Sequence, residues 1–387
     1  MQIAHKIEIT PNNVQKTYLN KCFGVSRFVF NWGLAEWDKQ YKEGLKPNGL
    51  KLKKEFNSIK KEQFPWVKEV TKWAAQQPFL NLQKSFDGFF KKKSGYPKFK
   101  KKGKTKDSFY IEGSCVKVEG EYLKIPVLDS KIKMTEELRF LGKINSAVIS
   151  RKSDRFFVSF QMEIPDKKPE VIRDRSVGID VGIKSLFVLS DGLIVNSINP
   201  LKNKLRRLKR LQRKFSKTKK GSNNFLKLKT KISRLYLKVS NLRKDILHKF
   251  TTFLVKNYSL IKIEDLNIKG MLKNHKLARA ISDLGLGEFA RQLIYKCKVY
   301  GRELVFTDRF FPSSKMCSDC GAIKKDLTLK DRVYFCDCGN KKDRDFNASL
   351  NINKIGRAPT EFTPVEITAL QNKVFPYFVS SIEESGI

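Results

Sequence analysis

The sequence predicts an α+β protein with several domains, and three observations lead to this prediction. The chain has 387 residues, more than one small hydrophobic core accommodates. Between residues 11 and 90 apolar residues recur at steps of three and four, as on one face of a helix, whereas residues 108 to 165 alternate or run apolar in short segments. From residue 176 three short strand-like segments are followed by a basic helical hairpin.

The charge balance predicts a polyanionic partner. The chain carries 79 Lys and Arg against 39 Asp and Glu, a formal net charge of +40, while 40% of its residues are hydrophobic and can form a core. Nucleic acids and membrane surfaces are both polyanionic. The sequence has no stretch of about 20 apolar residues and no signal-peptide pattern, so a membrane is not expected and nucleic acid is the favoured partner.

The N-terminal part opens with a short alternating strand, and a Pro-Asn-Asn sequence then signals a helix start. The helical pattern continues to about Phe90, and its aromatic residues are interpreted as the core of a bundle, with base stacking as the alternative. A basic run with aromatic residues follows, KKKSGYPKFKKKGKTK. In it, Lys98 and Lys100 are candidate contacts to a phosphate backbone, and a solvated linker is the alternative. Residues 108 to 165 are predicted to form an antiparallel β unit.

A strongly basic helical hairpin follows the strands of residues 176 to 198. Residues 202 to 249 contain 19 Lys and Arg and a single acid, Asp245. A solvated helix usually mixes charges of both signs, so this pair of helices is predicted to form a surface that binds a polyanion. The candidate phosphate contacts on its first helix are Arg206, Arg207, Lys209 and Arg210.

Four cysteines near the C-terminal end have the spacing of a structural zinc site. They form a C-x-x-C pair and a C-x-C pair, each followed by a glycine that permits a tight turn. Four thiolates would close a tetrahedron around Zn²⁺ and leave no open position, so the site is expected to be structural; unmetallated thiols are the alternative. The odd total of seven cysteines indicates a reducing cytoplasm. The candidate ligands are Cys317, Cys320, Cys336 and Cys338.

Three acids occupy positions that place a carboxylate at the edge of apolar elements: Asp180 in VGIDVG, Glu264 in IKIEDL and Asp345 in DRDFNA. Each has another explanation by itself, because turns, exposed strand ends and helix N-caps also favour acids. Together they are typical of a divalent-metal site, since Mg²⁺ prefers oxygen ligands and two ions about 3.5 to 4 Å apart assist phosphodiester hydrolysis. Asp345, near a helix N-terminus, is expected to stay readily ionised.

Four segments occur in the chain in this order: VGIDVGIKSLFVLSDG, IKIEDLNIKGM, SSKMCSDCG and DRDFNASLNI. Together they resemble the TnpB (OrfB) proteins of bacterial insertion sequences, which are RNA-guided nucleases related to type V CRISPR effectors. The resemblance implies a RuvC-like nuclease domain of RNase H fold, in which Asp180, Glu264 and Asp345 hold catalytic Mg²⁺ and the zinc knuckle is inserted before the last helix. It also implies a helical recognition lobe and a β-barrel wedge domain ahead of the nuclease domain.

The resemblance implies partners and domain boundaries as well. The partners are a guide RNA derived from the transposon end and a target double-stranded DNA with a short flanking motif, in the cytoplasm of a bacterium or archaeon and near its nucleoid. The expected boundaries are residues 1–10 plus 96–172 for the wedge domain, 11–95 for the recognition lobe, 173–310 for the nuclease domain with its hairpin at 201–254, 311–342 for the zinc knuckle, 343–356 for the last nuclease-domain helix and 357–387 for a flexible tail.

The activity that the resemblance implies is hydrolysis of DNA phosphodiester bonds by a metal-dependent endonuclease. A nuclease-inactive RNA-guided repressor is the alternative, which the presence of all three acids disfavours. An actin-like ATPase is a weaker alternative, because GIDVG resembles a phosphate loop but Ile183-Lys184 replaces the expected hydroxyl residues. The frequent label transposase suggests DNA strand transfer, yet the sequence has no evident Tyr or Ser nucleophile constellation for it.

Overall fold

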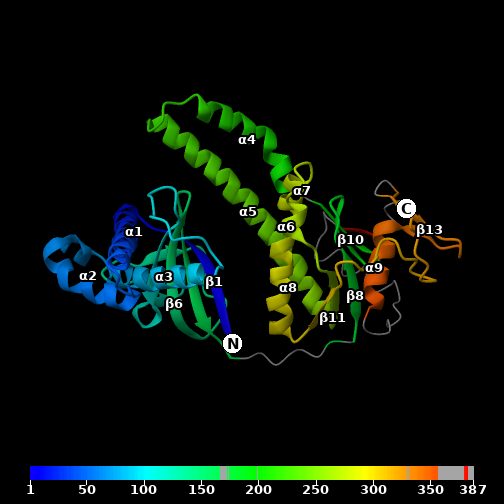
Figure 1. Cartoon of the computed structure of the whole chain (residues 1–387), viewed down its shortest axis with the longest axis horizontal. Coiled ribbons are helices and arrows are strands. Elements are labelled where there is room, and N and C mark those ends of the chain that lie inside the picture. Colours follow the sequence, from blue (N-terminus) through cyan, green and yellow to red (C-terminus); the bar gives the residue numbers. More distant parts are fainter. Residues whose placement is uncertain (166–171, 173, 198, 329–330, 356–378, 382–387) are drawn as a thin grey trace. The chain divides into compact units, whose positions relative to one another are not determined.

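A computed structural model gives the structure of the chain and describes residues 1–165, 172, 174–197, 199–328, 331–355 and 379–381. The chain divides into two compact units, Met1–Asp166 and Lys167–Ile387 (Figure 1). Both units contain helices and a sheet, so the predicted multidomain α+β class is confirmed.

Three α-helices make up the helical part of the first unit. The longest, α1, begins with a capping box: Asn12 Oδ1 accepts a hydrogen bond from the backbone N–H of Gln15, and Gln15 Oε1 accepts one from Asn12, both at 2.9 Å. Most of the aromatic residues pack in the core as predicted, and Trp37 stacks on Phe86 with 4.0 Å between ring centroids. Trp66 and Phe90 are exposed instead. The helices are α1 (Asn13–Lys42), α2 (Gly49–Gln63) and α3 (Lys72–Phe90), with 3-10 turns at Pro65–Glu69 and Gly113–Cys115.

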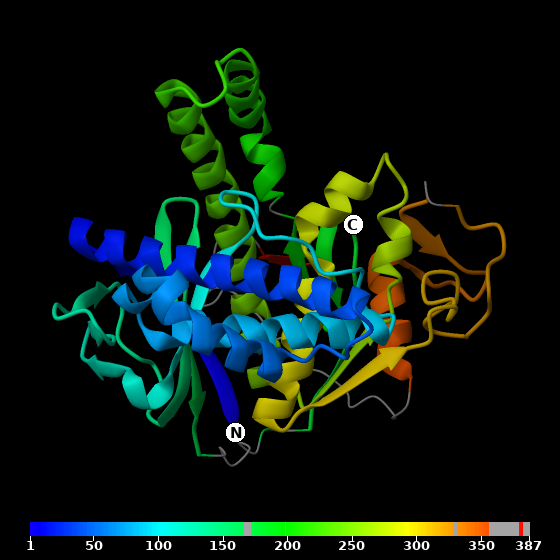
Figure 2. The same cartoon turned by 60° about the vertical axis from the view of Figure 1, so that its left-hand side comes forward.

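A seven-stranded antiparallel sheet forms the rest of the first unit, in the order β2-β6-β7-β1-β5-β4-β3. The N-terminal strand lies inside it, with Ile7 opposite Val158 and Ile9 opposite Phe156. Helices α1 and α3 pack against the sheet around a shared apolar core (Figure 2). The strands are β1 (Gln2–Thr10), β2 (Asp107–Glu112), β3 (Lys117–Glu119), β4 (Tyr122–Lys124), β5 (Ile132–Met134), β6 (Lys143–Lys152) and β7 (Arg155–Glu163).

A six-stranded mixed sheet organises the second unit, in the order β12-β11-β8-β9-β10-β15. Strands β8, β9 and β10 form an antiparallel meander, as the three-strand pattern predicts, while β8, β11 and β12 run parallel. Their carboxyl ends therefore meet at one edge, where ligands bind in open parallel sheets. The strands are β8 (Ser176–Asp180), β9 (Ser185–Leu189), β10 (Leu193–Asn196), β11 (Leu260–Glu264), β12 (Glu303–Thr307) and β15 (Val379–Ser381).

Strand β8 is covered on both faces. Val177 and Ile179 belong to a core that includes Phe250 of helix α5 (Asn223–Asn257) and Phe289 of helix α8 (Leu286–Tyr300). Gly178 faces the opposite side, toward helix α9 (Arg344–Lys354), because successive residues of a strand alternate between faces. Figure 1 shows α9 beside β8. The run of apolar residues in this segment is thus explained by helices on both sides of the strand.

The helices of the second unit cover the sheet and extend beyond it. The predicted basic hairpin is formed by α4 and α5 and projects from the sheet (Figure 2). At its base the buried Asp283 accepts hydrogen bonds from the backbone N–H groups of Leu201 and Lys202 and from the Arg243 guanidinium, so one carboxylate fixes both helices to α7. The helices are α4 (Pro200–Ser216), α5 (Asn223–Asn257), α6 (Ile268–Met271), α7 (Ala278–Leu284), α8 (Leu286–Tyr300) and α9 (Arg344–Lys354).

The region between β12 and α9 holds a small two-stranded sheet, β13 (Val333–Phe335) with β14 (Lys341–Asp343). The flexible tail predicted for residues 357–387 lies outside the described residues, except that Val379–Ser381 pairs with β10 as β15. None of the described helices is long and apolar enough to cross a membrane.

Candidate functional site

Asp180 and Glu264 lie side by side at the carboxyl edge of the second sheet. They are the last residues of the parallel strands β8 and β11, and Ile179 pairs with Ile263 immediately before them. Residues at matching positions of neighbouring parallel strands point to the same face, and such strands are about 4.8 Å apart. The register therefore brings together two acids from distant parts of the sequence.

Asp345 lies near Asp180 and Glu264 because helix α9, which carries it, crosses one face of the second sheet. A Cβ atom on Gly178 would lie 2.2 Å from the carbonyl oxygen of Ser349, so the α9 backbone passes directly over β8. Asp345 precedes Ser349 by about one helical turn and lies on the same side of α9. Its Oδ2 atom is 3.9 Å from the position that a Cβ atom on Gly182 would take. The three acids predicted to bind metal thus converge at one end of β8.

Asp345 is not the N-cap of α9, which is the alternative explanation for an acid at this position. The N-cap is Asp343, whose Oδ1 atom accepts hydrogen bonds from the backbone N–H groups of Asp345 and Phe346 at 2.9 and 3.0 Å. Because Asp343 satisfies the helix N-terminus, the Asp345 carboxylate remains available to a ligand.

The charges of the three acids affect one another. Burial raises the pKa of Asp180 well above its usual value, and the charges of Glu264 and Asp345 raise it further. Burial and the charge of Asp343 raise the pKa of Asp345, so these two effects oppose the ionisation that a place near a helix N-terminus favours. A divalent cation would offset this repulsion. Among the described residues only the cysteines bring three or more metal-ligand atoms within 4.8 Å of one another, so Asp180, Glu264 and Asp345 do not all lie within that distance of one another.

A hydrogen bond from Ser313 holds Glu264 in place. The Ser313 hydroxyl is buried and donates to Glu264 Oε1 at 2.5 Å. Asn351 of α9 in turn donates its side-chain N–H to the Ser313 carbonyl at 2.8 Å. The helix that carries Asp345 therefore also fixes the partner of Glu264.

Two further buried groups attach α9 to its surroundings. Asn347 donates to the Met316 carbonyl at 2.7 Å and accepts from the Ser318 backbone N–H at 2.9 Å, which ties the helix to the segment that contains the first cysteine pair. At the other end of α9 the buried Lys262 of β11 donates to the Asn353 carbonyl, where a cation suits the helix dipole. None of these supporting residues was predicted; the only signal is a pair of asparagines one helical turn apart in DRDFNASLNI.

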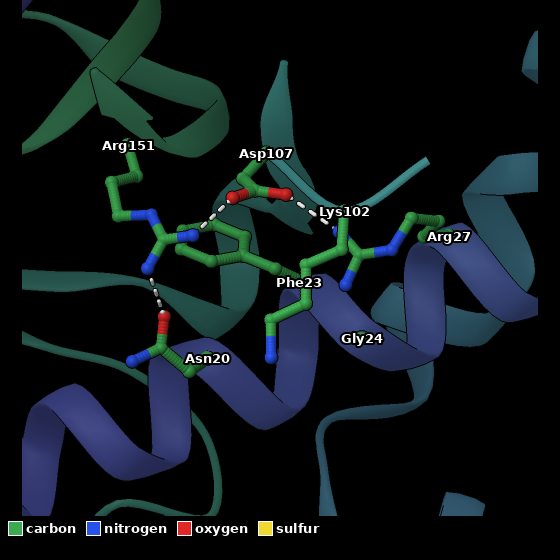
Figure 3. Close-up of a pocket in the computed structure, with 7 residues that line it drawn as sticks. All are labelled: Asn20, Phe23, Gly24, Arg27, Lys102, Asp107 and Arg151. Carbon is green, nitrogen blue, oxygen red and sulfur yellow. Dashed lines mark hydrogen bonds and ion pairs between the residues drawn. The ribbon is translucent and has the colours of Figure 1, made fainter. Parts of the chain in front are cut away.

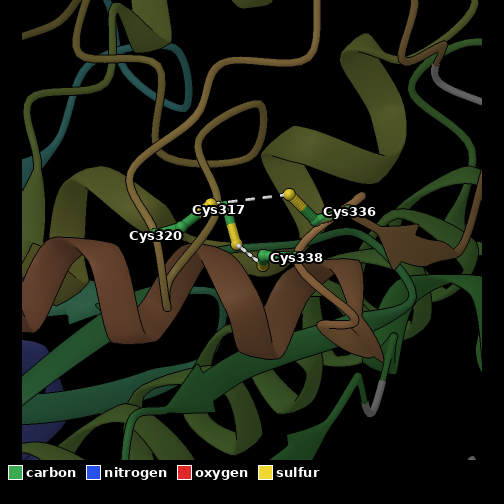
Figure 4. A group of neighbouring side chains, drawn as sticks. All are labelled: Cys317, Cys320, Cys336 and Cys338. Atoms are coloured by element: carbon green, nitrogen blue, oxygen red, sulfur yellow. Dashed lines mark hydrogen bonds between the residues drawn. The ribbon is translucent and has the colours of Figure 1, made fainter.

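The four cysteines form a compact group (Figure 4). The sulfur atoms of Cys317 and Cys338 are 3.6 Å apart, as are those of Cys320 and Cys336, and all four lie within 4.8 Å of one another. Zn–S bonds of about 2.3 Å in a tetrahedron give S–S distances of about 3.8 Å. The donor atoms and their spacing therefore fit Zn²⁺.

The surroundings of Cys317 favour a thiolate. Burial raises its pKa, but hydrogen bonds from the Cys320 backbone, from Asn340 and from the Asp319 backbone outweigh burial and lower the pKa to about 6. The Asn340 side chain donates to the Cys317 sulfur at 3.2 Å. Such hydrogen bonds to ligand atoms are typical of metal sites.

The two glycines that follow the cysteine pairs adopt positive φ, as the predicted tight turns require: Gly321 at 78° and Gly339 at 91°.

The residues predicted to contact phosphate differ in exposure. Lys98 is exposed, but Lys100 is half-buried, with its Nζ atom 3.7 Å from the centroid of the Phe30 ring. Burial and the nearby Arg27 charge lower the pKa of Lys100 to about 8. The four candidates on α4 are all exposed: Arg206, Arg207, Lys209 and Arg210.

These features define an α+β protein with a four-cysteine cluster that fits Zn²⁺ beside a group of carboxylates. Residues 159–275 match the OrfB_IS605 family, described as "Probable transposase", residues 287–352 match the Cas12f1-like TNB domain, and residues 1–46 match the OrfB_IS605 helix-turn-helix domain. A Streptomyces pristinaespiralis protein named "Putative RNA-guided DNA endonuclease" is 35% identical over 360 residues, which are 92% of this chain and 89% of that protein. InsQ of Escherichia coli K12, with the same description, is 30% identical over 373 residues, covering 92% of each chain. The chain belongs to the TnpB (OrfB) family.

A solved structure extends the comparison to the fold. Cas12f1, in its complex with sgRNA and target DNA, aligns with 88% of this chain and 83% of its own at a TM-score of 0.54. The two sequences are 17% identical over the alignment, so the likeness concerns the fold alone.

Proposed function

We propose that this chain is an RNA-guided DNA endonuclease that hydrolyses phosphodiester bonds with divalent metal ions. The observation that carries the proposal is the convergence of Asp180, Glu264 and Asp345 at the carboxyl edge of one sheet. Membership of the TnpB family supports RNA guidance, because relatives at 35% and 30% identity are described as RNA-guided DNA endonucleases. The net charge of +40 suits nucleic-acid partners.

In this proposal the two units have different roles. The second sheet and α9 form a RuvC-like nuclease domain of RNase H fold, while the first unit grips a guide RNA derived from the transposon end and a short flanking motif in the target duplex. Base pairing with the guide reads the target sequence. The proposed domains are the wedge domain (1–10 plus 96–172), the recognition lobe (11–95), the nuclease domain (173–310 with 343–356) and the zinc knuckle (311–342).

The carboxylates of this site are suited to hold Mg²⁺. When bound, the metal would stabilise the charge that develops on the scissile phosphate and assist formation of the attacking hydroxide. Asp180 and Glu264 offer oxygens from a rigid sheet edge, and Asp345 offers another from a helix packed on that sheet, so the ligand positions are fixed before substrate binds. Ser313 restricts the Glu264 carboxylate to one orientation.

The test uses the RNA that copurifies with the protein as the guide. It measures Mg²⁺-dependent cleavage of a plasmid that carries the sequence complementary to this guide. The variants Asp180→Ala, Glu264→Ala and Asp345→Ala each remove one ligand and should lower the cleavage rate by about 10²-fold or more, because the transition state loses electrostatic stabilisation. Guided binding to the target should persist, since the basic surfaces are unchanged.

The matched control is Asp326→Ala, which removes an exposed acid from the same unit and should cut like the wild type. A variant of the three that cuts normally would exclude that acid from the site. A wild-type protein that binds its target tightly in Mg²⁺ but never cuts would instead be the RNA-guided repressor.

A further inference from the structure

A cavity of about 270 Å³ opens in the first unit between α1 and the strands β2 and β6 (Figure 3). This volume is near the lower end of the range for ligand pockets, about 300 to 1,000 Å³, and it exceeds what a few ordered waters fill. Three cations and one acid are among its lining residues, which are Asn20, Phe23, Gly24, Arg27, Lys102, Asp107 and Arg151.

The single carboxylate of this cavity is shared by two arginines. Arg27 Nη1 lies 2.6 Å from Asp107 Oδ1, and Arg151 Nη2 lies 2.5 Å from Asp107 Oδ2, while the Asp107 side chain is only 6% exposed. Figure 3 shows the Lys102 side chain reaching over α1 between the two guanidinium groups. One carboxylate cannot neutralise three cations, so the cavity keeps a positive charge. Burial lowers the pKa of the nearby Lys100, and the positive charge of Arg27 lowers it further.

Gly24 gives independent evidence that the cavity accommodates a ligand. It lies inside the 30-residue helix α1, where glycine is unfavourable compared with alanine. A Cβ atom at this position would meet no atom within 4 Å, so neither packing nor backbone conformation requires glycine. Glycine without such a reason is expected where a ligand approaches the backbone closely.

We propose that this cavity binds a phosphodiester group of a nucleic acid. The guanidinium groups of Arg27 and Arg151 are held by Asp107 in fixed orientations, and an arginine fork matches the oxygens of a phosphate. Lys102, which is exposed, adds a third charge beside the bound group. The proposal deepens the proposed function, on which it rests for the nucleic-acid partner. The competing explanation is that the Arg27–Asp107–Arg151 cluster only fastens α1 to the sheet.

The test fills the cavity without removing any charge. The variant Gly24→Leu places a side chain in the open space, and Gly24→Ala is the matched control, which should fold at least as well as the wild type. Binding of the full-length chain is measured as a function of salt with two probes, the end-labelled copurified RNA and a DNA duplex that carries its target. For at least one probe Gly24→Leu should lower affinity about threefold or more and flatten the slope of log K against log salt by about 0.7 to 0.9.

The probe that loses affinity identifies the source of the phosphate, guide RNA or target duplex. Gly24→Leu could have the same unfolding temperature as the wild type and bind both probes with unchanged affinity and an unchanged slope of log K against log salt. In that case the Arg27–Asp107–Arg151 cluster is structural and the proposal is wrong. This readout does not depend on cleavage, so a chain that never cuts but loses binding on Gly24→Leu would overturn the nuclease proposal and keep the cavity.

A second pair of variants covers the case in which Gly24→Leu fails to fold. Lys102→Gln and Lys101→Gln each remove one exposed charge from the same segment, but only Lys102 lines the cavity. Lys102→Gln should flatten the salt slope by about 0.7 to 0.9 while Lys101→Gln changes it less. Equal effects of the two variants would contradict the proposal.

Discussion

The carbonyl oxygen of Ser349 lies so close to Gly178 that a Cβ atom there would be 2.2 Å away from it. A second contact is almost as short, since the same Cβ atom would be 2.5 Å from the backbone nitrogen of Asn353. Both partners are backbone atoms of α9, which cannot rotate away as a side chain would. The missing side chain of Gly178 therefore sets the height of α9 above the sheet, and with it the position of Asp345 relative to Asp180.

The first prediction concerns this contact. Gly178→Ala should lower the free energy of unfolding by about 3 kcal/mol or more, because α9 or β8 must move to admit the methyl group. Cleavage should fall as well, since Asp345 moves with α9. Chemical denaturation and the plasmid assay measure the two effects. Gly287→Ala is the control, because its Cβ atom would lie at an ordinary 3.7 Å from Ile268 Cδ1; if both variants are equally stable, α9 is not packed as described.

The second prediction concerns the support of Glu264. Ser313→Ala removes the hydroxyl that donates to Glu264 Oε1 and should raise the Mg²⁺ concentration needed for half-maximal cleavage by about 10- to 100-fold, as loss of such supporting groups does elsewhere. Saturating Mg²⁺ should restore part of the rate. Ser314→Ala changes the neighbouring serine and should leave the Mg²⁺ dependence near that of the wild type. An unchanged Mg²⁺ requirement in Ser313→Ala would show that this hydrogen bond does not orient a metal ligand.

The third prediction concerns the four cysteines. Elemental analysis of the purified protein should find about one tightly held zinc per chain, because four sulfurs lie at tetrahedral spacing. Cys320→Ser should lose the zinc, destabilise residues 311 to 345 and lower cleavage indirectly. The control is Cys115→Ser, since Cys115 lies outside the cluster in the first unit. Soluble and active wild-type protein without zinc would exclude a metal at this site.

Local patterns in the sequence were sufficient to predict the strands that carry Asp180 and Glu264 and the turns beside the cysteines. Alternation, apolar runs and glycine positions act over a few residues, so a single sequence reveals them. Strand Ile132–Met134 has no signal of its own within the β unit predicted for residues 108 to 165, because three residues are too few for a periodic pattern.

Contacts between distant segments could not be predicted in the same way. The hydrogen bond from Ser313 to Glu264 joins the segment before the cysteines to a strand far earlier in the chain, and no local pattern specifies which hydroxyl meets which carboxylate. The environment of Asp345 illustrates the same limit. Its position at a helix N-terminus is local, whereas the burial that raises its pKa arises from tertiary packing.

The fourth prediction concerns the basic hairpin. Changing all four residues, Arg206, Arg207, Lys209 and Arg210, to Gln should weaken nucleic-acid binding. Each phosphate contact that is lost reduces the number of counterions released on binding. The slope of log K against log salt should become shallower by up to about 0.7 per contact for single-stranded RNA and about 0.9 for duplex DNA. The hairpin should stay folded, since the four side chains are exposed while the buried Leu208 and the Asp283 contacts at its base are unchanged.

The matched control for the hairpin keeps the charge and changes only the shape of the cation. Replacing the three arginines with Lys should leave the salt slope close to that of the wild type, because counterion release depends on charge. Filter binding over a series of salt concentrations measures both variants with the copurified RNA. If the Gln variant keeps the wild-type slope, these four side chains are solvated and do not contact phosphate, and the prediction that the first helix of the hairpin binds a polyanion through them is wrong.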